Sequence, residues 1–207
     1  MNKMLVIVVD GLILFAVSTV LVIVADQGFS KLKGKTPKDD PIVTAIVQDK
    51  TDLLADLVKP GSAVTEKADE HGRTALMRAA YANIDGKKLL EETDTKREPI
   101  IQLLISNGAK IDAKDKDGWT ALMWAAWSNM PKTAAMLMKN GASPDTTDKR
   151  GNTALTLAAR RGNVAIVRLL STGGDRKAAI EQAQAGMAEY PGKKADYEAI
   201  VTLLGGS

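Results

Sequence analysis

The sequence predicts an all-α protein: a solenoid of about five helix-turn-helix units over residues 41–207, preceded by one N-terminal membrane helix over residues 1–25. Three observations support this prediction. A short motif occurs three times, glycines recur at a fixed spacing, and a long apolar segment lies at residues 4–25. A fixed period of about 33 residues is typical of stacked structural repeats.

Composition excludes several classes of chemistry. The 207 residues are 45% hydrophobic and 26% charged, which is typical of a folded protein with a sizeable core. The chain has no cysteine and one histidine, His71, so thiol nucleophiles, cysteine zinc sites and paired imidazoles are excluded. The net charge of +3 comes with no dense basic stripe. We therefore expect no catalytic, cofactor or metal site and no nucleic-acid partner.

The N-terminal helix is predicted from Met4 to Ala25, which together contain a single charge, Asp10. A helix of this length spans about 33 Å at ~1.5 Å per residue, enough for a hydrocarbon core of ~30 Å. It has no polar face, unlike a helix on the surface of a soluble domain. We expect a retained transmembrane or signal-anchor helix. A cleaved signal peptide is the alternative. Cleavage after Ala25 would place Ile23 at the −3 position, where a small residue is preferred, so this site is poor.

The surroundings of this segment leave its orientation open. Asp10 either reaches the membrane interface or is protonated, or it pairs with a cation on another helix. Residues 26–40 are polar and form a linker. The lysines in this linker favour a cytoplasmic C-terminal domain. Apolar segments at an extreme N-terminus, however, commonly export the domain after them, so a periplasmic or other extracytoplasmic domain is equally compatible.

The rest of the chain repeats one unit. Thr-Ala-Leu occurs at 74–76, 120–122 and 153–155, each time with a glycine two residues before it and an alanine pair after it. Asp-x-x-Gly precedes each motif and predicts a turn, and the threonine can cap the helix that comes next. The glycines that recur with the repeat period suit the left-handed end of a second helix. They are Gly108, Gly141 and Gly174. Two short helices cannot bury their faces alone, so the units must stack.

These motifs resemble the ankyrin repeat family. The family signature T-P-L-H-x-A is written here as TALMRAA, TALMWAA and TALTLAA, at 74–80, 120–126 and 153–159. Alanine replaces the proline each time, and the histidine is replaced by Met77, Met123 and Thr156. The buried histidine network of the family is therefore absent. The resemblance covers about four fifths of the chain and implies an ankyrin solenoid.

The predicted boundaries follow the period. Residues 41–69 form an N-terminal cap, 70–115, 116–148 and 149–175 form the central repeats, and 176–207 form a degenerate C-terminal cap. An insertion at residues 85–97 extends the second repeat. It is either a surface loop or a second contact surface with another helical turn. In the first repeat, Asp49 occupies the place where a turn glycine is usual.

The resemblance implies a binding groove lined by the hairpin tips and the exposed side of the first helix of each repeat. All three tryptophans fall at matching positions, and Trp and Arg often dominate interface energetics. We expect Trp119, Trp127 and Arg160 to be exposed together. Trp124 alternatively packs against neighbouring repeats, and Arg160-Arg161 is either a solvated pair or a grip for a carboxylate. The predicted groove residues are Arg73, Tyr81, Trp119, Trp124, Trp127, Asn152, Arg160 and Arg161.

The expected function is that of a membrane-tethered protein–protein interaction module that binds a partner protein through this groove. The alternative is a periplasmic inhibitor or immunity-type protein that occludes a partner enzyme after signal-peptide cleavage. In either case we expect a protein partner rather than a small-molecule substrate. The acids are scattered in turns, and His71 has no serine or cysteine close to it in sequence, so an enzyme is not expected.

Overall fold

The computed structural model describes residues 5–9, 12–16, 41–58, 67–81 and 90–205. The chain divides into two compact units, residues 1–38 and residues 39–207. The second unit contains the predicted repeats. The insertion at 85–97 and the linker at 26–40 lie partly or wholly outside the described residues.

The N-terminal unit corrects the prediction of one continuous helix over 1–25. Its described residues form two antiparallel strands, β1 (Leu5–Val9) and β2 (Leu12–Ala16), with Val9 paired to Leu12. Both strands are rich in Val, Ile and Leu, and Asp-Gly separates them in sequence, a pattern that favours a β-hairpin. Asp10 lies outside the described residues. Among the helices of the described part of the chain, none is long and apolar enough to cross a membrane.

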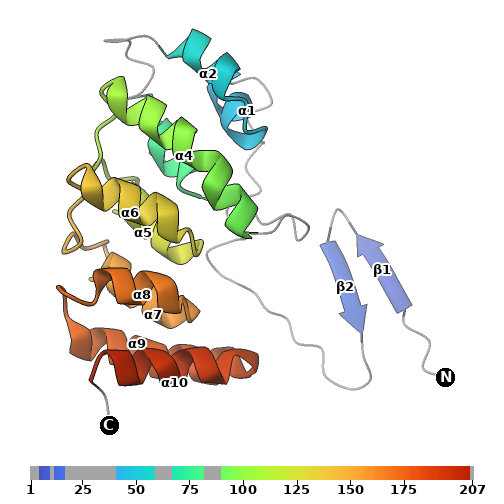
Figure 1. The fold of residues 1–207 in the computed structure, drawn as a ribbon. Coiled ribbons are helices and arrows are strands. Elements are labelled where there is room, and N and C mark those ends of the chain that lie inside the picture. The colour runs from blue at the N-terminus through green and yellow to red at the C-terminus, as the bar shows by residue number, and fades with distance from the viewer. Residues whose placement is uncertain (1–4, 10–11, 17–40, 59–66, 82–89, 206–207) are drawn as a thin grey trace. The chain divides into compact units, whose positions relative to one another are not determined.

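The second unit is an all-α stack of helix pairs within its described residues (Figure 1). Each pair, together with the hairpin that precedes its first helix, forms one repeat, numbered 1 to 5, so the turn aspartates Asp69, Asp115 and Asp148 begin repeats 2, 3 and 4 instead of ending the units predicted from the sequence. The pairs are α1 (Pro41–Val47) and α2 (Thr51–Leu57); α3 (Ala75–Ala79) and α4 (Leu90–Ser106); α5 (Ala121–Trp127) and α6 (Pro131–Lys139); α7 (Ala154–Arg161) and α8 (Val164–Leu170); α9 (Arg176–Glu189) and α10 (Lys194–Leu203), the last preceded by a 3₁₀ turn at Pro191–Lys193.

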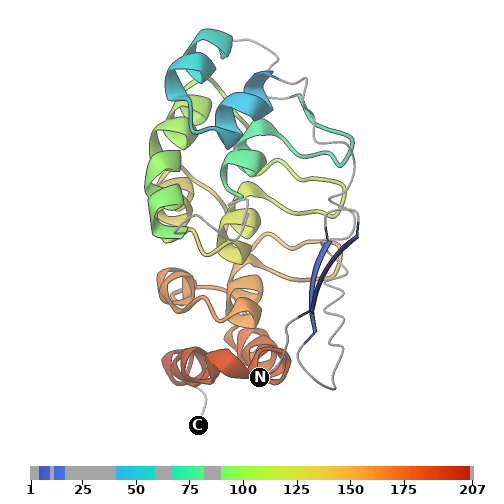
Figure 2. The ribbon, with the colours of Figure 1, turned by 90° about the vertical axis from the view of Figure 1, so that its right-hand side faces the viewer.

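The helices form two layers. First helices pack on first helices from α1 to α9, and second helices pack on second helices from α2 to α10. Figure 2 shows the hairpins that precede α3, α5 and α7 projecting to the same side of these layers. The core lies between the layers, where the alanine pairs of α3, α5 and α7 are fully buried. Small side chains at these positions let neighbouring helices approach closely, and the predicted stack depends on that approach.

The predicted helix caps are confirmed. The hydroxyl oxygens of Thr74, Thr120 and Thr153 accept the backbone N–H three residues on, at 3.3–3.4 Å. Only the third also has a reciprocal bond, because the Thr156 hydroxyl oxygen accepts the Thr153 backbone N–H at 2.8 Å. At the two sites with methionine in place of the family histidine, Met77 and Met123 are buried apolar core.

Glycine is required in the hairpins that join repeats 2, 3 and 4. Gly72 and Gly118 have φ of +78° and +86°, which favours residues without a Cβ. A Cβ on either would also meet the backbone nitrogen of the next hairpin, Lys116 or Lys149, at 3.0 Å. That approach permits hydrogen bonds between hairpins: Lys116 N–H donates to the His71 carbonyl at 2.9 Å, and Lys149 N–H donates to the Asp117 carbonyl at 3.0 Å.

The turn inside each pair explains the unusual aspartate of repeat 1. Asp49 has φ of +53°, and its equivalents Asn129 and Gly162 have +54° and +70°. Asn and Asp tolerate the left-handed region better than other side chains. Asp49 then has a second role, because its carboxylate pairs with Arg97 Nε at 2.7 Å, with both side chains buried.

The described part of the insertion is helical, as in the second alternative, and it carries two buried charged side chains beside exposed ones. Residues 90–97 form the first turns of α4, and Asp94 and Arg97 within them are 2% and 3% exposed. Asp94 accepts the backbone N–H groups of Lys132 and Thr133, at 2.7 and 2.9 Å, and so caps α6 of the next repeat. The insertion therefore connects repeats 1, 2 and 3. Arg97 and Asp49 form an ion pair with both side chains buried, so removing one of these two charges would cost about 3–5 kcal/mol.

Repeat 5 packs against repeat 4 through a glycine. A Cβ on Gly186 of α9 would lie within 2.3–2.8 Å of the Arg160 carbonyl oxygen and the Tyr197 ring. Tyr197 is fully buried and donates its hydroxyl to the same carbonyl at 3.0 Å. A side chain at position 186 would separate these groups.

We expect Gly186→Ala to destabilise the protein by about 1–3 kcal/mol, because the added methyl overpacks the contact between α9 and α7. Helix propensity alone would give the opposite sign, by about 1 kcal/mol. Urea unfolding followed by circular dichroism measures the difference. Gly192→Ala is the matched control, since a Cβ there meets nothing within 4 Å. Equal stability of the two variants would contradict the packing described here.

Candidate protein-binding surface

The three turn aspartates hold the hairpins of repeats 2, 3 and 4 in the same way. One carboxylate oxygen of Asp69, Asp115 and Asp148 accepts two backbone N–H groups, from the residues two and four positions later, all at 2.8–2.9 Å. This closes each turn and leaves the second oxygen free to accept another group. Asp115 and Asp148 are buried, and Asp69 is half-buried.

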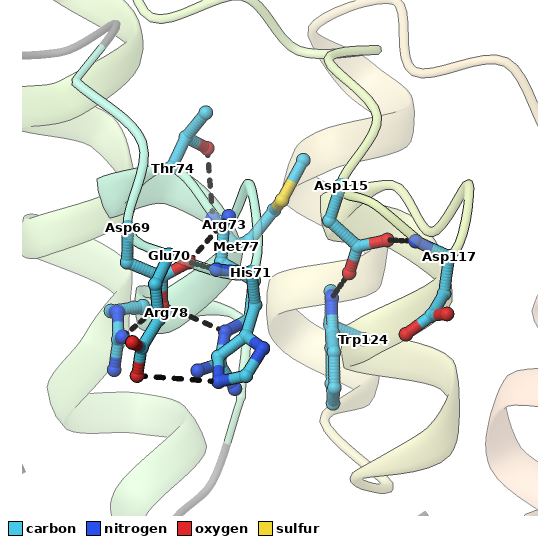
Figure 3. Close-up of polar contacts among 10 residues, drawn as sticks. All are labelled: Asp69, Glu70, His71, Arg73, Thr74, Met77, Arg78, Asp115, Asp117 and Trp124. Atoms are coloured by element: carbon cyan, nitrogen blue, oxygen red, sulfur yellow. Dashed lines mark hydrogen bonds and ion pairs between the residues drawn. The ribbon is translucent and has the colours of Figure 1, made fainter. Parts of the chain in front are cut away.

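The second oxygen differs among the repeats. In repeat 2, that of Asp69 accepts the guanidinium groups of Arg73 and Arg78, as Figure 3 shows. In repeat 3, that of Asp115 accepts the indole N–H of Trp124 at 3.1 Å.

In repeat 4, the second oxygen of Asp148 accepts the indole N–H of Trp119, which belongs to the preceding repeat, at 3.1 Å. It also accepts the Asn152 amide at 3.0 Å. The turn aspartates therefore orient the surface side chains as well as the backbone.

Four rings lie in one continuous row across repeats 2 and 3. We call Tyr81, Trp124, Trp119 and Trp127 the aromatic row. The ring centroids of Tyr81 and Trp124 are 5.2 Å apart, those of Trp124 and Trp119 are 4.7 Å apart, and those of Trp119 and Trp127 are 5.6 Å apart. These spacings and the edge-to-face angles are those of stabilising aromatic pairs.

The structure brings the three predicted tryptophans together, but it does not leave them fully exposed. Each of the four rings in the row is half-buried. Trp119 was expected to be exposed with Trp127 and Arg160, yet its N–H group bonds to Asp148 of the next repeat and its ring lies between two others. Trp124 packs against a neighbouring repeat through Tyr81, in agreement with the alternative considered for it.

Arg161 extends the row toward the C-terminus. Its guanidinium carbon lies 4.5 Å from the Trp127 ring centroid and 5.5 Å from that of Tyr190, which are cation–π distances. The same guanidinium donates to the Tyr190 hydroxyl at 3.2 Å. The ordered surface therefore runs from repeat 2 to repeat 5, although Tyr190 is not among the predicted groove residues.

The other predicted groove residues are paired within the chain. Arg73 bonds to Asp69 and its side chain is 13% exposed, so it flanks the row as part of the turn. Arg160 pairs with Glu189 at 2.8 Å and with the Gln182 amide oxygen at 3.2 Å. Among the described residues, no group of three His, Asp or Glu is placed to hold a metal ion.

The different partners of the turn aspartates have opposite electrostatic effects. Burial acts to raise the pKa of Asp69, but the N–H group of Arg73 and the positive charges of Arg73 and Arg78 outweigh it and lower the pKa below its ordinary value. Burial also acts on Asp115, where no cation opposes it. The N–H groups from the backbone and Trp124 only partly offset that effect, and the pKa of Asp115 is raised.

Sequence reasoning missed the role of these aspartates as acceptors for the surface side chains. A signal was present: Arg78 and Trp124 each stand nine residues after the turn aspartate, and both carry N–H donors. A carboxylate that closes a turn with one oxygen needs another partner for the second when it is buried. No comparable signal indicated that Trp119 bonds to the next repeat.

The opposite pKa shifts predict opposite pH dependence for two matched variants. A lowered pKa makes ionised Asp69 stabilising above its unfolded pKa of about 3.9, and this contribution is lost as the pH falls through the folded pKa. A raised pKa means that the folded state binds the Asp115 proton more tightly, so the contribution of Asp115 grows as the pH falls from 7 toward about 4. Asn at either position keeps an oxygen for the turn.

We therefore expect Asp69→Asn to lose about 2 kcal/mol at pH 7 and to lose less as the pH falls through the folded pKa of Asp69. The stability of the wild type relative to Asp115→Asn should instead rise as the pH falls from 7 toward about 4. Urea unfolding free energies at a series of pH values measure both. Slopes of the same sign would show that the environments of these aspartates do not differ in this way.

Comparison with known proteins agrees with the geometry. A family model described as "Ankyrin repeats (3 copies)" matches residues 48–148 and 93–183, which together span about two thirds of the chain. No curated protein matches the sequence. The helix pairs of repeats 2, 3 and 4, their capped first helices and the hydrogen-bonded hairpins lie within the residues that the family model covers. The chain belongs to the ankyrin repeat family.

Proposed function

We propose that this protein is a membrane-tethered interaction module that binds a partner protein across the aromatic row and the adjacent hairpins. Ankyrin repeats suggest a protein–protein interaction module and are typically non-catalytic. The observation that carries the proposal is the row itself, four aromatic rings side by side: Tyr81 just after α3, Trp119 in the hairpin of repeat 3, and Trp124 and Trp127 on α5.

Energetics support a binding role for the row. Half-buried aromatic rings keep apolar area in contact with water, and a partner that covers them gains the free energy of removing that area. Aromatic interactions and bonds to aspartates fix the rings beforehand, so little side-chain entropy is lost on binding. Within the described part of the chain, Trp127 is the only tryptophan whose indole N–H has no hydrogen-bond partner. It is therefore the best candidate for a central anchor.

Membrane attachment through residues 1–25 is the second element of the proposal. It is supported by sequence alone: the stretch from Met4 to Ala25 contains a single charge and is followed by a polar linker. Attachment would hold the repeat domain at a membrane surface, where the effective concentration of a membrane-bound partner is raised.

We expect Trp127→Ala to weaken partner capture by about 2 kcal/mol, or roughly thirtyfold, and to cost only about 1–2 kcal/mol of stability. Trp119→Ala should cost more stability, about 2–3 kcal/mol, since it removes two ring contacts and leaves Asp148 with one donor fewer. Co-purification from native membranes, followed by affinity measurement with the recovered partner, gives the first quantity. Thermal unfolding gives the second.

Arg168→Ala is the matched control for this experiment. Arg168 is exposed on α8, in the layer of second helices, and its substitution should leave both capture and stability unchanged. If Trp127→Ala leaves capture intact, the proposed binding surface is wrong. A melting temperature lowered as much as in Trp119→Ala would show in addition that the row serves folding.

For the tether, we expect the full-length protein to stay in the membrane pellet after an alkaline carbonate wash, with its original N-terminus. Deletion of residues 1–25 should release the repeat domain into the supernatant with its helical circular dichroism unchanged, because residues 39–207 form a separate compact unit. A wild-type protein recovered in soluble form and beginning near Asp26 would instead establish a cleaved signal peptide.

A further inference from the structure

The C-terminal end of the ordered surface is covered by residues of the same chain. Glu189 Oε2 accepts a hydrogen bond from Arg160 Nη2 at 2.8 Å. The guanidinium of Arg161 lies against the Tyr190 ring and also against the ring of Trp127, the last residue of the aromatic row. A carboxylate and the aromatic ring that follows it in sequence therefore contact two adjacent arginines. We call Arg160, Arg161 and Trp127 the arginine subsite.

The ionic contact at this subsite can be exchanged at little cost. The Arg160 and Glu189 side chains are 40% and 43% exposed, and an ion pair with that much access to water contributes little to stability. Tyr190 is half-buried and its hydroxyl bonds to Arg161 at the surface. A partner carrying the same two groups would therefore replace contacts of similar strength.

The position of Glu189 and Tyr190 at the end of α9 allows their side chains to leave the subsite while the buried residues of this helix stay packed. Glu189 is the last residue of α9 and Tyr190 follows it, while the buried residues of that helix are Ala179, Ala183 and Gly186. The arginine subsite keeps its backbone partners, because Tyr197 and Lys193 bond to the carbonyl oxygens of Arg160 and Arg161 at 3.0 and 3.1 Å. Displacement then moves the side chains of Glu189 and Tyr190, while the backbone bonds of Tyr190 with Gly186 and Lys193, at 2.8 and 3.0 Å, stay in place.

We propose that the arginine subsite recognises a partner segment in which an acidic residue is followed by an aromatic residue, and that Glu189 and Tyr190 occupy the subsite until such a segment displaces them. The subsite deepens the proposed function and rests on it, since it names the chemistry of one part of the partner. The planar guanidinium of Arg160 suits a carboxylate, and that of Arg161 stacks on aromatic rings. While Glu189 and Tyr190 occupy the subsite, a partner cannot bind there. The apparent affinity for the partner is therefore the intrinsic affinity multiplied by the fraction of molecules in which the subsite is open.

The test uses the full-length protein and a synthetic peptide of residues 186–193, which carries the Glu-Tyr pair. A second peptide with glutamine and alanine in place of that pair is the control probe. Glu189→Gln opens the subsite in the protein while it keeps the helix and its packing. Glu181→Gln, on an exposed glutamate of the same helix, is the matched control. The indole N–H signal of Trp127 in nuclear magnetic resonance spectra follows binding at the subsite.

We expect the Glu-Tyr peptide to shift the Trp127 signal saturably and to bind Glu189→Gln roughly tenfold more tightly than the wild type or Glu181→Gln. The control peptide should bind none of them. Adding Arg161→Lys to Glu189→Gln should abolish the gain, since lysine keeps the charge but lacks the planar group that stacks. The thermal unfolding of each variant should remain a single transition within a few degrees of the wild type.

Equal binding of the Glu-Tyr peptide to Glu189→Gln and to the wild type would overturn the inference, as would equal binding of the two peptides or no binding at all. These results leave the proposed function in place if Trp127→Ala still weakens capture of the native partner. The proposed function itself fails only if capture is unaffected by Trp127→Ala, so the two failures are distinguishable.

Discussion

The carboxylate of the turn aspartate is the group on which the candidate surface depends. In repeats 2, 3 and 4, one oxygen closes the hairpin by accepting two backbone N–H groups. The other oxygen accepts a hydrogen bond from a surface side chain, and the type of that side chain decides whether the surface of the repeat is charged or aromatic. At Asp69 the donors are two arginine guanidinium groups, so this turn carries ion pairs. At Asp115 the donor is the indole N–H of Trp124, so the surface at this turn is aromatic. The same turn geometry thus supports different surface side chains along the stack, because closing the turn uses only one of the two carboxylate oxygens.

Hydrogen bonds between neighbouring repeats join the separate hairpins into one continuous surface. Trp119 belongs to repeat 3 but donates to Asp148 of repeat 4, and Asn163 of repeat 4 donates to the Ala126 carbonyl oxygen at 2.7 Å. Asp94 caps a helix of the following repeat in the same manner. Each link satisfies a polar group that the stack would otherwise bury without a partner, which is costly. The repeats therefore cannot shift past one another without losing these bonds, and the aromatic row is held as a unit.

The sequence predicted the features that are local and periodic, and failed where a single residue departs from the period. The threonine caps, the left-handed glycines and the paired helices follow from residue types at fixed spacing, and the structure has them. The apolar N-terminal segment was assigned to a helix by its length, although Asp-Gly within it favours a hairpin. The roles of Asp94 and Arg97 could not be foreseen, since their partners lie in other repeats. The direction of the Trp119 ring depends on Asp148, far along the chain in the next repeat, and no spacing rule relates them.

Hydrogen exchange at the tryptophan indoles tests most directly whether the turn aspartates hold the aromatic row. The indole N–H groups of Trp119 and Trp124 bond to buried carboxylates at 3.1 Å, whereas that of Trp127 has no hydrogen-bond partner among the described residues. We predict slow exchange with deuterium for Trp119 and Trp124 and rapid exchange for Trp127, with Asp115→Ala accelerating exchange at Trp124 more than at Trp119. Similar exchange rates at all three indoles would contradict the claim that the turn aspartates fix these rings.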